Sequence, residues 1–449
     1  MVSINEAMRV VKDDLAYLLD PGSIFAICRQ VGHSWRNSVL NPAAIIHVFV
    51  MQILRGNTAC THLRQLSGLS FTASAYCQAR MRLPLKVFQL LVQRLCEHLS
   101  GTCDQHALWR GHRLWQVDGS SASMPDTPEL QQYFGQPGEQ KRGCGFPVTS
   151  ILALMHAGTG LLTDLLVRPL RTHEMSGIVS LHERLKANDV LIADRGFCSY
   201  AHICLLLEGS MHCVFRLHQG IAVSFRPGRP SQKQLPTSQR KGQPRSRYIR
   251  KLGRHDQWVE YPRPKTGPKW MGPQQYVGLP QSIIVRELRY QVHQPGYRSR
   301  TITLVTTLLD HKKYPAEELS QLYGDRWQIE VDIRHLKTTL GMEVLHCKTV
   351  DGVLKEMWIY MLVYNLVRQV MLEAAKRQGV EPERISFIDA LRWLCCVKLG
   401  ESLTLLVVNP LRTGRIEPRV LKRRMKKYKL MNKPRHVLRQ AIINEQLTD

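Results

Sequence analysis

The chain has 449 residues, 44% of them hydrophobic, and a formal net charge of +26. This length suits about two to four domains with large cores, and the charge favours a polyanionic partner, most simply nucleic acid, although a ribosomal or membrane-surface protein would share it. Twelve cysteines without a CxxC pair argue against a zinc or disulfide framework, and the longest apolar run, 42–54, is too short to cross a bilayer.

Residues 1–108 are expected to form an all-helical domain. Apolar residues recur at helical spacing in 8–19, 43–54 and 87–99.

The N-terminus lacks the pattern of a signal peptide, so we expect a cytoplasmic protein with reduced thiols and no membrane partner. A group of basic residues could contact phosphates or simply form a solvated helical face: Arg55, Arg64, Arg80, Arg82 and Lys86.

From residue 113 the pattern becomes that of an α/β layer on a mixed sheet. The segment LWQVDGSS predicts a strand that ends at Asp118, and 190–193 predicts a short buried strand that ends at Asp194. Strand ends in such a sheet converge at one edge, so the two aspartates could share a site. The other expected elements are a hairpin at 148–155 and 161–167, helices at 173–186 and 200–207, and a strand at 211–217.

Residues 219–308 are interpreted as a β-rich insertion. The stretch 209–255 has no Asp or Glu and carries eleven Lys and Arg, which predicts an exposed basic loop. Two runs, 282–294 and 300–308, alternate like strands. The insertion thus separates the first α/β half from the helix that follows.

A polar stripe marks the stretch 321–340, which we expect to be one helix. Its members are Tyr323, Arg326, Glu330 and Lys337. On a helix they fall within an arc of about 60°, beside an apolar stripe that begins at Ile329. Such a face suits a polyanion held at a metal. The simpler interpretation is a surface helix with a Glu–Arg pair.

Two further carboxylates compete with Glu330. Asp332 lies about 160° from it on a helical wheel and should face away. Asp325 is expected near the helix start, where a capping role is simpler. Phosphoryl transfer on nucleic acid commonly uses two Mg²⁺ ions held by acidic residues, so Asp118, Asp194 and Glu330 together are the candidate set. Lone aspartates at strand ends are more often turn formers.

The C-terminal part begins with a strongly apolar helix expected at 353–374. The tail from 411 to 440 carries twelve Lys and Arg and one acid. Its centre, LKRRMKKYKL, either binds phosphates or is a frayed basic tail, and both interpretations predict non-specific affinity for DNA.

The spacing Tyr, two residues, Arg, three, Glu, six, Lys resembles the Y-R-E-K signature of the DDE transposases of bacterial insertion sequences, in the family numbered four. Tyr323, Arg326, Glu330 and Lys337 meet every spacing. The strand before Asp118, the IADRGF stretch at Asp194 and the basic tail also resemble that family. The resemblance runs through most of residues 20–435.

The resemblance implies a ribonuclease-H-like catalytic core interrupted by a β-rich insertion, with an all-helical N-terminal domain and a basic C-terminal tail. The implied domains are 1–108, helical and DNA-binding; 109–218, first part of the core; 219–308, insertion; 309–400, second part of the core; and 401–449, basic C-terminal region.

The resemblance also implies a chemistry. Asp118, Asp194 and Glu330 would bind two Mg²⁺ ions, with Mn²⁺ as a substitute, and Arg326 and Lys337 would hold phosphates, with Tyr323 contacting a phosphate or supporting a hairpin. The enzyme would bind terminal inverted repeats and target double-stranded DNA, as a homodimer in a synaptic complex. It would cut through a DNA hairpin and join 3′-OH ends to the target, within a bacterial cytoplasm and nucleoid. Trp258 and Trp270 are candidates for stacking on a flipped base, or for packing.

Two other functions compete with transposition. One is another ribonuclease-H-like nuclease, such as a resolvase or repair nuclease, and the Y-R-E-K spacing and the long insertion argue against it. The other is a non-catalytic DNA-binding protein derived from a transposase, which the intact triad argues against. Inverted repeats around the coding region would favour mobility.

Overall fold

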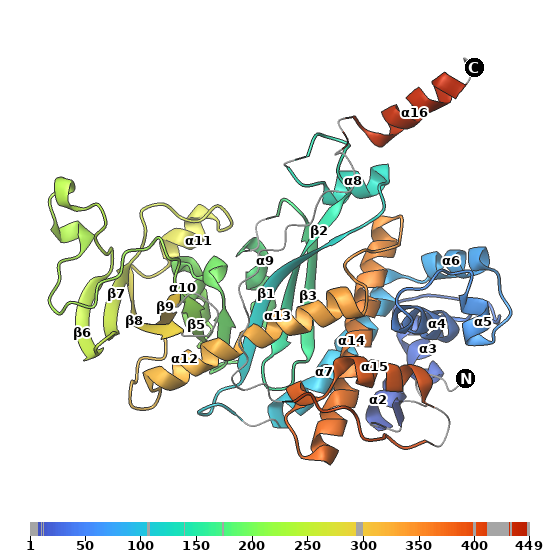
Figure 1. The fold of residues 1–449 in the computed structure, drawn as a ribbon, viewed down its shortest axis with the longest axis horizontal. Coiled ribbons are helices and arrows are strands. Elements are labelled where there is room, and N and C mark those ends of the chain that lie inside the picture. Colours follow the sequence, from blue (N-terminus) through green and yellow to red (C-terminus); the bar gives the residue numbers. More distant parts are fainter. Residues whose placement is uncertain are drawn as a thin grey trace.

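The protein is a mixed α/β molecule built around one nine-stranded sheet (Figure 1). Its structure is a computed structural model. It describes residues 8–9, 11, 13–105, 108–138, 140–172, 175–292, 300–397, 401–410, 431 and 433–446. The strand order is β3-β2-β1-β4-β5-β9-β8-β7-β6.

The N-terminal region is helical, as its periodicity predicts. Its elements are α2 (Asp13–Leu18), α3 (Pro21–Gln30), α4 (Pro42–Leu54), α5 (Leu63–Ser67), α6 (Ala73–Arg82) and α7 (Leu85–Gln105). Local caps fix two of the starts, since the side chains of Asp20 and Asn41 accept bonds from backbone N–H groups in the first turns of α3 and α4. A proline follows each cap, at a position where its missing N–H costs no helical bond.

The first five strands form the centre and one edge of the sheet. They are β1 (Leu114–Ser123), β2 (Val148–His156), β3 (Leu162–Pro169), β4 (Val190–Ala193) and β5 (His212–Arg216). The hairpin of β2 and β3 is confirmed, and β4 has the predicted bounds. β1, β4 and β5 are parallel to one another, whereas β2 runs antiparallel to β1. The helices packed near them are α8 (Pro128–Phe134), α9 (Met175–Leu181) and α10 (Tyr200–Glu208).

The prediction that the first strand ends at Asp118 is wrong. β1 continues to Ser123, because residues 119–123 pair with β2. Its pairing with β4, however, stops at Val117 opposite Ala193. Asp118 therefore lies within a strand, at the point where one of the two neighbouring strands ends.

The later strands continue the same sheet. They are β6 (Arg247–Gly253), β7 (Asp256–Pro262), β8 (Ser282–Val292) and β9 (Arg300–Thr306), with α11 (Pro273–Gly278) between β7 and β8. β9 pairs antiparallel with β5 and so joins them to the centre. The expectation of an exposed basic loop over 209–255 is only partly right. β5 and β6 lie within it, and Arg229 is buried, bonding to the carbonyls of Ser224 and Ser246.

The stretch 321–340 is not one helix. α12 (Ala316–Asp325) and α13 (Trp327–Arg334) meet at Arg326, and a π-helical turn, η5 (His335–Thr339), follows. Asp325 is the last residue of α12, so the expected cap at a helix start is wrong. Its carboxylate instead accepts a bond from Gln321. α12 packs on β5 and α13 on β1, so the two helices cross one face of the sheet (Figure 1).

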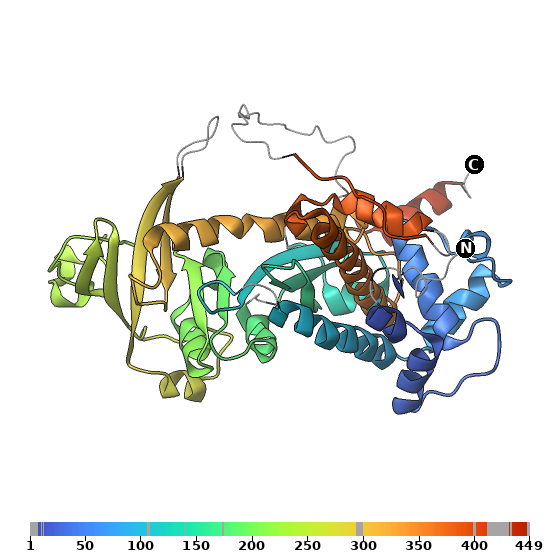
Figure 2. The same cartoon turned by 90° about the horizontal axis from the view of Figure 1, so that it is seen from below.

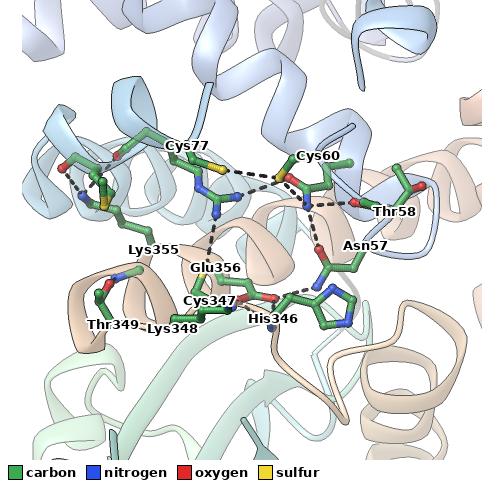
Figure 3. A pocket seen from close by; sticks show the side chains of 15 residues that line it. Asn57, Thr58, Cys60, Cys77, His346, Cys347, Lys348, Thr349, Lys355 and Glu356 are labelled. Carbon is green, nitrogen blue, oxygen red and sulfur yellow. Dashed lines mark hydrogen bonds between the residues drawn. The ribbon is translucent and has the colours of Figure 1, made fainter. Parts of the chain in front are cut away.

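The long helix α14 (Val350–Gln378) joins the N-terminal helices to the core. It is largely buried and runs beside α7 (Figure 2). At its start a pocket of about 360 Å³ lies against α4 and α6 (Figure 3). There Asn57 Nδ2 donates to Glu356 at 2.6 Å, and Lys355 Nζ donates to the carbonyls of Arg80 and Met81. These bonds tie the helical region to the core.

Two more helices complete the described chain: α15 (Phe387–Cys396) and α16 (Arg435–Gln446). The centre of the basic tail, 421–430, lies outside the described residues. Among the helices that the structure describes, none combines the length and apolar character needed to span a bilayer.

Candidate active site

The two predicted aspartates lie beside each other on adjacent parallel strands. Val117 pairs with Ala193, so Asp118 and Asp194 are the next residues on strands about 4.8 Å apart. Side chains alternate along a strand, so Asp194 lies on the same face as Ile192, two residues before it. Ile192 packs in the same cluster as Tyr323 of α12. Both carboxylates therefore lie on the face that α12 and α13 cover.

Arg326 connects the helix carboxylate to the sheet. Its guanidinium lies 2.8 Å from Glu330 Oε1 and 3.6 Å from Asp118 Oδ2. The side chains of Asp118 and Glu330 keep 24% and 34% exposure, whereas that of Arg326 keeps 11%. The buried Nε of Arg326 has no hydrogen-bond partner in the described part of the chain. One cation thus holds two carboxylates from different elements.

Asp194 has two partners of its own. Tyr323 donates its hydroxyl to Asp194 Oδ1 at 3.1 Å, and Arg216 lies 3.8 Å from the same oxygen. Sequence reasoning missed Arg216. A signal was present, since it is a basic residue in the predicted strand 211–217. Phe215 pairs with Ala193, so Arg216 follows beside Asp194.

The local charges alter the acidity of two groups. Burial raises the pKa of Asp118, and the nearby carboxylates of Glu330 and Asp194 add to this, against the Gly119 N–H and Arg326. Burial also raises the pKa of Tyr323, so its hydroxyl stays protonated and remains a donor. The carboxylates thus repel one another, and the site favours a cation.

The donor set suits a hard divalent cation, because carboxylate oxygens are the ligands that Mg²⁺ and Mn²⁺ prefer. The carboxylates are not yet gathered around one point, however. Within the described ranges, no group of three or more His, Cys, Asp or Glu side chains stands where it could hold a metal ion. The Arg326 guanidinium lies between Asp118 and Glu330, so a shared ion requires that side chain to turn away.

Lys337 and the rival carboxylate Asp332 make no ion pair or hydrogen bond with this group within the described residues. Lys337 lies in η5, partly buried, and its ammonium makes no hydrogen bond or ion pair within the described residues. Asp332 is buried and faces α14, where it pairs with Arg368, as the helical wheel predicts.

The two tryptophans of the insertion have packing contacts. Trp258 Nε1 donates to the carbonyl of Leu309 at 2.9 Å, and Arg250 lies over its ring. Trp270 packs against the core beside α10 and β5.

Comparisons with known proteins identify the family. Residues 109–366, which contain all three carboxylates, match the family model "Transposase DDE domain". The chain is 27% identical over 375 residues to the transposase InsG of insertion sequence element IS4 from Escherichia coli K12, covering 79% of this chain and 77% of that protein. It is 28% identical over 135 residues to the putative transposase InsZ of the same organism, covering 30% and 45%.

Among solved structures, the chain is similar to a piggyBac transposase in a synaptic complex with hairpin DNA, with a TM-score of 0.44 and 10% identity over 88% of this chain and 80% of that one. DDE transposase domains use divalent metal ions, in agreement with the carboxylate donor set. The family match spans more than half of the chain. The chain therefore belongs to the DDE transposases and is an enzyme of the insertion sequence IS4 type.

Proposed function

We propose that this transposase binds the ends of its own insertion sequence, cleaves them by metal-dependent phosphoryl transfer and joins the 3′-OH ends to target DNA. The observation that carries the proposal is the register of β1 and β4, which brings Asp118 beside Asp194, together with the Arg326 guanidinium that links Asp118 to Glu330. Asp118, Asp194 and Glu330 are the proposed catalytic residues.

The same three carboxylates would hold two Mg²⁺ ions, with Mn²⁺ able to replace them. Bound ions would supply an activated oxygen nucleophile and stabilise the leaving oxygen. In the free protein the Arg326 and Arg216 guanidinium groups lie beside the carboxylates and lower their mutual repulsion.

Arg326, Tyr323 and Lys337 are the proposed phosphate-binding residues. A guanidinium recognises phosphate through two parallel N–H bonds, so Arg326 can exchange its carboxylate partners for a phosphate. Its unpartnered Nε is a free donor for that purpose. Tyr323 donates to Asp194 in the free protein and could hold that carboxylate in place or turn to the DNA. Lys337 has no competing partner within the described residues.

The proposed pathway is cut and paste through a hairpin. Water would cut one strand at the element's end and leave a 3′-OH, which attacks the opposite strand, closes a hairpin and releases the flanking DNA. Water then reopens the hairpin and restores the 3′-OH, which attacks a phosphodiester bond of the target DNA and releases a target 3′-OH. Because two ends must be held together, the active form would be a homodimer in a synaptic complex. It would work in a bacterial cytoplasm, on the nucleoid.

The proposed domains follow the same boundaries as the sequence expectations: 1–108 helical and DNA-binding, 109–218 and 309–400 the two parts of a ribonuclease-H-like core, 219–308 the insertion, and 401–449 a basic tail. The order β3-β2-β1-β4-β5, with β1, β4 and β5 parallel, supports a ribonuclease-H-like core. The net charge of +26 supports contacts with double-stranded DNA.

The proposal is tested by incubating DNA that carries the element's ends with Mg²⁺ and the wild type, Asp118→Ala, Asp194→Ala or Glu330→Ala. The wild type should cut and all three variants should not. If the variants cut like the wild type, the triad is wrong. A denaturing gel reports the pathway, because linear ends without hairpins would exclude the hairpin step.

The same experiment separates the alternative functions. A wild type that binds the end DNA but does not cut it with any divalent ion would be a non-catalytic DNA-binding protein. A wild type that cuts but never joins 3′-OH ends to a target plasmid would be a nuclease.

A further inference from the structure

One buried hydroxyl near the candidate site has no partner. Tyr290 lies on β8, and its oxygen is buried without a hydrogen bond in the described chain. Its ring packs against the cluster formed by Leu288, Leu304 and Tyr323, so it lies on the face covered by α12. A buried hydroxyl left unpaired is unfavourable, so a retained one calls for an explanation.

The register of the sheet places Tyr290 on the same face as the active-site residues. Arg216 is opposite Leu304 on β9, and Tyr290 is opposite Ile302, two residues before Leu304 on the same strand. Directly opposed residues project to the same face, and so do residues two apart. The row directly across the sheet thus runs through Asp118, Asp194, Arg216, Leu304 and Leu288, and Tyr290 lies on the same face, two residues along β8 from Leu288.

The charges that act on the Tyr290 hydroxyl are positive. Burial raises the pKa of Tyr290 to about 12, and the Arg216 and Arg326 guanidinium groups act against that rise. The hydroxyl is thus protonated and is a donor. A second donor, Nε of Arg326, is also buried and unpartnered. Two unused donors on one face of the sheet, the Tyr290 hydroxyl and Nε of Arg326, indicate a missing anionic acceptor.

We propose that the Tyr290 hydroxyl donates a hydrogen bond to a phosphate oxygen of the DNA strand held at Asp118, Asp194 and Glu330. This inference rests on the proposed function, because it assumes that DNA lies across the carboxylates. It adds a phosphate contact from β8 to those expected from α12 and α13. The contact would position the strand beyond the bond that is cut.

Tyr290→Phe tests the proposal, because it removes only the oxygen. The probe is duplex DNA with the terminal sequence that flanks the coding region, with binding measured in Ca²⁺ and cleavage in Mg²⁺. The affinity of the variant should fall about tenfold, the value of one hydrogen bond to a charged group. Its thermal stability should equal or exceed that of the wild type, since no bond within the protein is lost.

Tyr360→Phe is the matched control. The Tyr360 hydroxyl is also buried, but it lies on α14 and faces Asn57 and Glu356 instead of the candidate site. That variant should bind and cleave end DNA like the wild type. An affinity loss shared equally by both variants would overturn the proposal, because it would reflect general repacking.

Replacing single phosphates by neutral methylphosphonates identifies the contact. One position should weaken binding to the wild type and have little further effect on Tyr290→Phe. Equal effects on both proteins at every position would overturn the proposal, as would an unchanged affinity of Tyr290→Phe while the wild type cleaves normally. If the wild type itself does not cleave, the proposed function fails instead.

Discussion

Two arginines, Arg326 and Arg368, each pair with two carboxylates, and the two clusters differ in how far they are exposed to solvent. Arg326 holds Asp118 and Glu330, which keep a quarter to a third of their side-chain exposure. Arg368 of α14 holds Asp332 and Glu383, and its side chain and that of Asp332 are 1% and 3% exposed.

The two clusters also differ in how many hydrogen-bond donors of the arginine have a partner within the protein. Arg368 also donates to the carbonyl of Thr159 at 2.7 Å, so its bonds are directed within the protein. Arg326 keeps an unpartnered buried Nε and lies beside carboxylates that open to solvent. Glu330 and Asp332 are only two residues apart but are separated by about 160° around the helix. One side of α13 thus carries the candidate chemistry and the other secures the helix.

The largest expected effect is a loss of stability when the cluster around Arg368 is broken. Arg368→Leu leaves the buried Asp332 unpaired and should lower the free energy of unfolding by about 3–5 kcal/mol. Urea denaturation measures the change. The double variant Arg368→Leu, Asp332→Leu should recover most of the loss, because it removes both buried charges and leaves only the partly exposed Glu383. A loss of less than about 1 kcal/mol in the single variant would contradict the difference between the clusters.

Arg326→Gln should have a small effect on stability and a large effect on cleavage. Its partners are partly exposed, so the free energy of unfolding should fall by about 1 kcal/mol or less. Cleavage of end DNA should fall about 100-fold, since a buried charged contact to a phosphate is lost. Urea denaturation and single-turnover cleavage measure the two effects. A large loss of stability with normal cleavage would make Arg326 a structural residue like Arg368.

A third buried pair carries no charge and allows a pH test. His202 and His182 face each other with their Nε2 atoms 3.0 Å apart, below the turn that follows Asp194. Burial lowers the pKa of His182 to about 4 and that of His202 to about 3. Both lie below the unfolded value of about 6.5, so the unfolded chain binds more protons as the pH falls.

Stability should therefore be constant above pH 6.5 and fall below it, by about 1.4 kcal/mol per pH unit for each histidine. Urea denaturation between about pH 7 and pH 5 measures this slope. Burial also lowers the pKa of His47, His212 and His335, which add to the slope in both proteins. His182→Gln removes one titrating group of the pair and should make the slope less steep by that group's share. A slope unchanged in that variant would show that the pair does not control acid sensitivity.

The sequence was sufficient to predict the secondary-structure elements that depend mainly on their own residues. The apolar run at β4 and the hairpin of β2 and β3 are fixed by their own residues and turns. The extension of β1 through residues 119–123 could not be predicted. These small, polar residues favour turns, and they form a strand only because β2 pairs with them.

The same limit applies to the candidate site. The spacing of Tyr323, Arg326 and Glu330 could be read from the sequence. Tyr323 and Arg326 do contact the aspartates of the sheet, and Glu330 joins them through Arg326. The break between α12 and α13 has no proline or capping signal, and the position of Arg326 between two carboxylates depends on packing across β1. Arg216 and Tyr290 depend on strand register, which a single sequence does not reveal.

The most direct test compares Glu330→Gln with Asp332→Asn, two neutralised carboxylates on one helix. Each protein is assayed for thermal stability and for single-turnover cleavage of end DNA in Mg²⁺, below its melting temperature. Glu330→Gln should be as stable as the wild type and at least about 1000-fold slower, because the site loses a proposed metal ligand. Asp332→Asn should be less stable and should cleave at nearly the normal rate. Normal cleavage by Glu330→Gln, or a selective loss of cleavage in Asp332→Asn, would contradict the assignment of the active site.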